Sequence, residues 1–109
     1  MAELSKRQKR VLRELLRRAY RAELGMELDK LLVEFQRWKA GEIEPGDVAH
    51  AIHEFHDGPN RELSRLYDEL DLRLAVARAI ALDLVDRSAV PAEVLADLEP
   101  LIDFARDST

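Results

Sequence analysis

The spacing of helix-breaking residues is the feature that most constrains this fold. Four glycines and four prolines interrupt 109 residues. Leu, Ala, Arg and Glu dominate the stretches between them, and β-branched residues are few and scattered, so local propensities favour helix almost throughout. Most of the breakers fall where the helical period of the apolar residues fails: Gly41, Pro45, Gly46, Gly58, Pro59 and Pro91. The sequence therefore predicts an all-α fold, a small antiparallel bundle with main helices over residues 5–40, 45–57, 59–87 and 91–106.

The first predicted helix begins at Ser5, a good N-cap residue, and ends before Gly41, which suits the left-handed position after a helix. Its apolar stripe rotates by about 150° between the first half and the second, at 100° per residue. Either the helix breaks at Gly25, or it is continuous and its halves pack on different partners. Continuity is favoured, because one glycine costs only about 1 kcal/mol and neither proline nor a capping residue stands beside it.

The remaining helices follow the same logic. Pro45 suits the first position of the second helix, which should end at Gly58. The helix over 59–87 has a regular apolar seam and is predicted to pair with the first helix, while Pro100 kinks or splits the last one. Aromatic residues at buried-stripe positions are expected in the core: Phe35, Trp38, Phe55, Tyr67 and Phe104.

Length and composition indicate one helical domain over residues 1–109. The absence of cysteine excludes a disulfide framework and thiolate metal sites. No apolar stretch is long enough to span a membrane, so no membrane contact and a cytoplasmic location are expected, and the small size and Arg, Leu and Ala content are typical of bacterial proteins. Phosphate-binding and nucleophile motifs are missing as well. No cofactor is expected, and a non-enzymatic role is favoured over an enzymatic one.

All three histidines fall within seven residues, which raises a metal-binding hypothesis. On a helix, His50 with Glu54 and His53 with Asp57 are four residues apart, the spacing by which one helix offers two ligands, and His56 lies beside them. A zinc site needs three or four ligands. The alternative is a solvated helix face, with His56 favoured by the dipole at a helix C-terminus.

The N-terminal segment separates from the rest by charge. Residues 1–21 hold eight Lys or Arg and two Glu, a net charge of +6, so the other 88 residues carry −11. A basic amphipathic helix over residues 1–22 is predicted to project to a partner. The candidate interaction surface joins an apolar row to a basic face: Leu12, Leu15, Leu16, Ala19, Arg10, Arg13, Arg17 and Arg21.

These features favour an interaction or scaffold protein that self-associates through its basic N-terminal helix, most simply as a homodimer. Other protein partners fit the same surface. One alternative is a nucleic-acid-associated accessory protein that uses the basic helix, since cationic helices neutralise phosphates. A second is a metal-dependent enzyme or sensor built on His50, His53 and His56.

Overall fold

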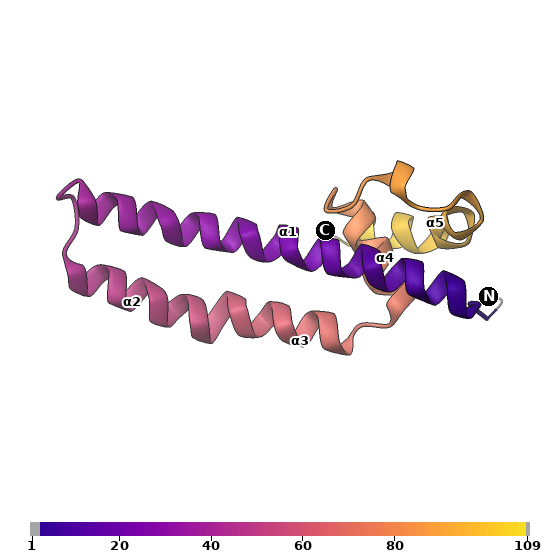
Figure 1. Ribbon diagram of the computed structural model, residues 1–109, viewed down its shortest axis with the longest axis horizontal. Helices are drawn as coiled ribbons and strands as arrows, with labels where there is room; N and C mark the ends of the chain where they lie inside the picture. Colours follow the sequence, from indigo (N-terminus) through magenta and orange to yellow (C-terminus); the bar gives the residue numbers. More distant parts are fainter. Residues whose placement is uncertain (1–2, 109) are drawn as a thin grey trace. The chain divides into compact units, whose positions relative to one another are not determined.

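A computed structural model describes residues 3–108, and the part it describes is helical, without strands. The all-α prediction is confirmed. The elements in order are α1 (Lys6–Lys39), α2 (Pro45–Phe55), a π turn (His56–Asn60), α3 (Arg61–Glu69), α4 (Leu72–Ala81), a short 3-10 turn (Arg87–Ala89) and α5 (Ala92–Asp107). The ribbon in Figure 1 carries these labels.

Helix α1 begins and ends where its sequence predicts. The backbone N–H of Gln8 donates to Ser5 Oγ (3.0 Å), and the Ser5 N–H donates to Gln8 Oε1 (2.9 Å), a reciprocal N-terminal cap. The helix runs through Gly25 without a break, so the prediction of continuity is confirmed. It ends in a Schellman motif: Gly41 has φ +78°, and the Glu42 N–H reaches back to the Arg37 carbonyl (2.9 Å).

The predicted helix end at Gly58 is wrong, because the chain stays helical from Pro45 to Glu69. A π turn over His56–Asn60 joins α2 to α3 and contains Pro59. Proline has no N–H and its ring crowds the carbonyl four residues earlier, and a widened turn is one way to accommodate it. Short-range propensity marks Gly58 and Pro59 as breakers and does not reveal this solution.

The prediction of one helix over residues 59–87 is also wrong. Helix α3 ends at Glu69 and α4 begins at Leu72. The Asp71 carboxylate caps α4 by accepting hydrogen bonds from the backbone N–H groups of Arg73 (3.2 Å) and Leu74 (3.4 Å). A second Schellman motif closes α4, with Asp83 at φ +58°. Helix α5, in contrast, continues through Pro100 without splitting.

The chain divides into two compact units, each described by itself. The terminal unit comprises the residues up to Arg21 and those from Glu69 onward, and the hairpin comprises Ala22–Asp68. Among residues 3–108, fourteen buried apolar side chains lie in the terminal unit and only two, Val48 and Leu63, in the hairpin. The terminal unit therefore has a hydrophobic core, in which α4 and α5 pack together. The hairpin has only a small hydrophobic core.

In the hairpin the chain reverses direction over residues 40–44, so that α2 and α3 return alongside the second part of α1 (Figure 1). Near the open end, the Tyr67 hydroxyl donates to Glu23 Oε1 (2.9 Å) and ties the two arms together. Within residues 3–108 no helix has the length and apolar character to cross a membrane.

Candidate interaction surfaces

The predicted N-terminal interaction surface is divided by the fold into a buried part and an exposed part. Leu12 is fully buried (0 % exposed), Leu15 and Ala19 are buried as well, and Leu16 is half-buried. The three buried side chains belong to the same unit as α4 and α5, whose apolar residues form its core. Residues of the chain itself therefore bury these apolar side chains, which the sequence led us to expect a partner to bury. Self-association as such stays a prediction.

The basic side of the same segment is open to solvent. All of its Lys and Arg residues are exposed: Lys6, Arg7, Lys9, Arg10, Arg13, Arg17, Arg18 and Arg21. Glu14 pairs with Arg17 (2.7 Å) and, at a longer distance, with Arg18 (3.8 Å). The other six cations form no ion pair with any residue in the range 3–108. Within residues 3–108, the ion pairs of this face with acidic groups of its own chain are thus limited to those with Glu14.

The histidine cluster forms the two predicted pairs. His50 contacts Glu54, and His53 Nε2 lies 3.0 Å from Asp57 Oδ2. All four side chains are largely exposed, and His56 falls in the π turn. Within residues 3–108 no group of three or more His, Cys, Asp or Glu side chains is arranged to hold a metal ion. Each pair thus offers two ligands, fewer than a structural or catalytic zinc site needs.

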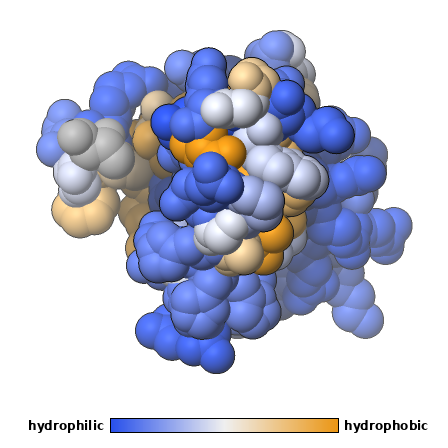
Figure 2. All heavy atoms as spheres, turned by 90° about the vertical axis from the view of Figure 1, so that its left-hand side faces the viewer, coloured by the Kyte–Doolittle hydropathy of each residue, from blue (hydrophilic) through white to orange (hydrophobic). Residues whose placement is uncertain are grey.

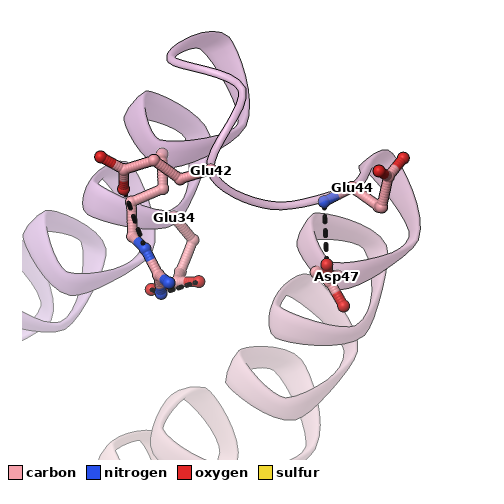
Figure 3. A network of polar contacts seen from close by, with 5 residues as sticks. Glu34, Glu42, Glu44 and Asp47 are labelled. Carbon is pink, nitrogen blue, oxygen red and sulfur yellow. Dashed lines mark hydrogen bonds and ion pairs between the residues drawn. The ribbon is translucent and has the colours of Figure 1, made fainter.

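One flank of the hairpin is a groove of about 650 Å³ between α1 and α2, lined by both charged and apolar side chains. Its walls carry charges of both signs, with Lys30 and Arg37 beside Glu27, Glu34 and other carboxylates. Figure 3 shows the network at its closed end, where the Arg37 guanidinium lies 3.2 Å from Glu34 and 3.4 Å from Glu42. The hydrogen bond and charge of Glu34, helped by Glu42, raise the pKa of Arg37. The groove's cations already have acidic partners.

At the start of α2, which Figure 3 also shows, the Glu44 N–H donates to Asp47 Oδ2 (2.8 Å). This bond satisfies a backbone donor that would otherwise be left open at the helix N-terminus. The polar contacts in this part of the hairpin therefore have structural explanations, and no nucleophile with a positioned base accompanies them.

The opposite flank of the hairpin is apolar. A notch of about 190 Å³ is lined by Trp38, Pro45, Val48, Ala49 and Ile52. Along α1, Leu28 (45 % exposed) and Leu32 (52 %) lie roughly 140° to 180° around the helix from the groove residues Lys30 and Arg37, at 100° per residue. We name this surface, Leu28, Leu32, Trp38, Pro45, Ala49 and Ile52, the apolar flank. In Figure 2 the turn end of the hairpin faces the viewer and shows small hydrophobic patches among mostly hydrophilic side chains.

Sequence reasoning missed the apolar flank, because it placed Trp38 in the core. Trp38 (38 % exposed) is exposed, as are Leu28 and Ile52 (43 %) of the same flank. Phe104 in α5, another predicted core aromatic, is 63 % exposed. The signal that could have identified the flank is the width of the apolar stripe. Two paired helices bury only the residues between them, so a stripe wider than this contact leaves apolar side chains exposed.

Comparisons with protein-family models, with curated proteins and with solved structures find no match for this chain. The surfaces described above are therefore the observations that bear on its function.

Proposed function

We propose that this chain is a non-enzymatic interaction protein that self-associates, and that two copies meet through the apolar flank of the hairpin. The observation that carries the proposal is the distribution of exposed apolar groups. Of the eight large apolar side chains exposed among residues 3–108, six lie in the hairpin: Met26, Leu28, Leu32, Val33, Trp38 and Ile52. Four of these, Leu28, Leu32, Trp38 and Ile52, belong to the apolar flank, and exposed apolar surface of this kind is typical of a site that contacts another macromolecule.

The hairpin also lacks the core that would stabilise it alone. Val48 and Leu63 are its only buried apolar side chains within the described range. Small units with so little buried surface usually depend on oligomerisation or another constraint. Two hairpins packed flank to flank make a four-helix arrangement, the commonest way for paired helices to cover a second apolar face. A second copy is the simplest occupant, because an isologous contact needs one self-complementary surface and closes as a dimer.

The flank takes the place of the N-terminal row in this proposal. Leu12, Leu15 and Ala19 are buried within their own unit and have no apolar surface left for a partner. The hairpin carries eleven acidic and five basic residues, so charge repulsion opposes its self-association. Added salt screens this repulsion and should strengthen the dimer modestly.

Sedimentation equilibrium over about 1 to 50 micromolar protein tests the proposal, since stable interfaces show in that range. We expect a dimer. The double variant Leu28→Glu/Leu32→Glu should be a monomer with unchanged helix content by circular dichroism. Phe104→Glu is the control, because it places one such negative charge on an exposed apolar site of the other unit. It should leave the dimer intact.

Trp38 is the only tryptophan and lines the notch, so its fluorescence gives a local readout. Dilution of the wild-type protein should shift the emission to the red as the indole becomes exposed, and the double variant should show the red-shifted spectrum at all concentrations. A wild-type monomer at 50 micromolar (about −6 kcal/mol for the corresponding Kd) would overturn the proposal. So would a dimer that persists in the double variant or dissociates equally in Phe104→Glu.

A further inference from the structure

The first part of α1 carries a narrow stripe of positive charge. At 100° per residue, Lys6, Arg10, Arg13, Arg17 and Arg21 lie within about 80° of the helix circumference. With a rise of 1.5 Å per residue they extend over about 22 Å, with neighbours roughly 4.5 to 6 Å apart along the axis. The buried side chains Leu12, Leu15 and Ala19 occupy the opposite side of the helix, so the fold presents this stripe to solvent.

The charges of the stripe are little neutralised by the chain. Among the residues in the range 3–108, only Arg17 of the stripe has an acidic partner, Glu14, and that pair is itself exposed. Four of the five cations are arginines, whose guanidinium groups form paired hydrogen bonds with the oxygens of phosphate. Lys9, a further exposed cation without an ion pair within residues 3–108, borders the stripe.

The composition of the stripe favours one class of partner over the others. A protein interface usually has an apolar centre from which charged residues are depleted, and the stripe has no apolar side chain. A helix that lies on a membrane surface inserts an exposed apolar face, whereas the apolar face of this segment is buried in its own unit. Binding of phosphates needs neither feature, because release of counterions supplies the free energy.

We propose that this stripe docks on the phosphate backbone of double-stranded nucleic acid without reading its sequence. Recognition of bases would require side chains that reach base edges, and single strands are usually held by stacking on aromatic groups. The stripe contains neither the amide side chains that read adenine nor an aromatic side chain, and Tyr20, the only aromatic residue of the segment, is half-buried. A straight row of cations over about 22 Å can face successive phosphates of one strand, which are spaced by 3.4 Å of rise in duplex DNA.

The assay is fluorescence anisotropy with labelled DNA duplexes of about 12 base pairs and two unrelated sequences. Five phosphate contacts give an expected slope of about −4.5 for log K against log salt concentration, for one copy bound per duplex. Both sequences should bind equally. The variant Arg10→Gln/Arg13→Gln/Arg21→Gln leaves two stripe cations, so its slope should fall to about −2 and its affinity should drop strongly at 50 mM salt.

Lys39→Gln/Arg61→Gln/Arg65→Gln is the matched control, because it removes three exposed cations of the hairpin and changes the net charge equally. It should keep the wild-type salt slope. Absence of binding at 50 mM salt, an equal loss in the control variant, or binding to phosphatidylglycerol vesicles but not to DNA would overturn the inference. Leu28→Glu/Leu32→Glu leaves the stripe intact and should still bind the duplex, so this proposal and the proposal of self-association can fail separately.

Discussion

The substitution Leu12→Ala tests whether the N-terminal apolar row belongs to the core of one copy or to an interface between copies. Leu12 is fully buried within the chain. The change removes three methyl or methylene equivalents, which is about 2.4 kcal/mol of transfer free energy, and an unfilled cavity raises the loss to about 3 to 5 kcal/mol. With a urea slope of about 1.5 kcal/mol per M, a loss of 3 kcal/mol moves the unfolding midpoint by roughly 2 M.

The measurement is urea denaturation followed by circular dichroism, at two protein concentrations tenfold apart. Leu16→Ala is the matched control, since Leu16 is half-buried one turn along the same helix and should lose less than half as much free energy of unfolding. The loss in Leu12→Ala should be the same at both concentrations, and sedimentation equilibrium should show an unchanged association constant. A loss below about 1 kcal/mol, or weakened association with little change in unfolding, would refute the assignment of Leu12 to the core.

Two further predictions concern backbone geometry and pH. Asp83 occupies the left-handed region (φ +58°), so Asp83→Gly should stabilise the protein by about 0.5 to 1 kcal/mol, whereas Gly41→Ala at φ +78° should destabilise it by a similar amount, both measured by urea denaturation. Hydrogen bonds from the Ser88 backbone N–H, and then from its side chain, lower the pKa of Asp86. The stabilising contribution of Asp86 is therefore present above its ordinary pKa of 3.8 and is lost as the pH falls through the lower folded value. Comparing acid unfolding of the wild type and Asp86→Asn measures it, and equal pH dependence in the two proteins would contradict it.

Much of the fold follows from local rules that apply to short stretches of the sequence. Ser5 with Gln8 three residues later marks the start of α1, and Gly41 marks its end. Pro45 begins α2, as its missing N–H and fixed φ favour. These features depend on a few neighbouring residues, so one sequence suffices to predict them.

The errors arise where distant parts of the chain decide the outcome. Whether Ile52 and Trp38 are buried depends on how many helices surround the hairpin, and a periodic stripe does not reveal that number. The passage through Pro59 depends on a π turn, which the local sequence does not reveal. The histidine pairs were predicted by spacing alone, but whether a third ligand stands nearby depends on the tertiary fold.

The rotation of the apolar stripe along α1 connects the remaining observations. The buried row Leu12, Leu15 and Ala19 and the inward-facing row near Leu31 and Phe35 point about 140° apart on one continuous helix. The helix predicted over residues 59–87 is likewise not continuous, since it is interrupted at residues 70 and 71. The side of α1 opposite the first row then needs no apolar cover, which permits five cations to share it. The charge asymmetry and the change of apolar face thus both divide α1 near the boundary between the two compact units, which lies between Arg21 and Ala22.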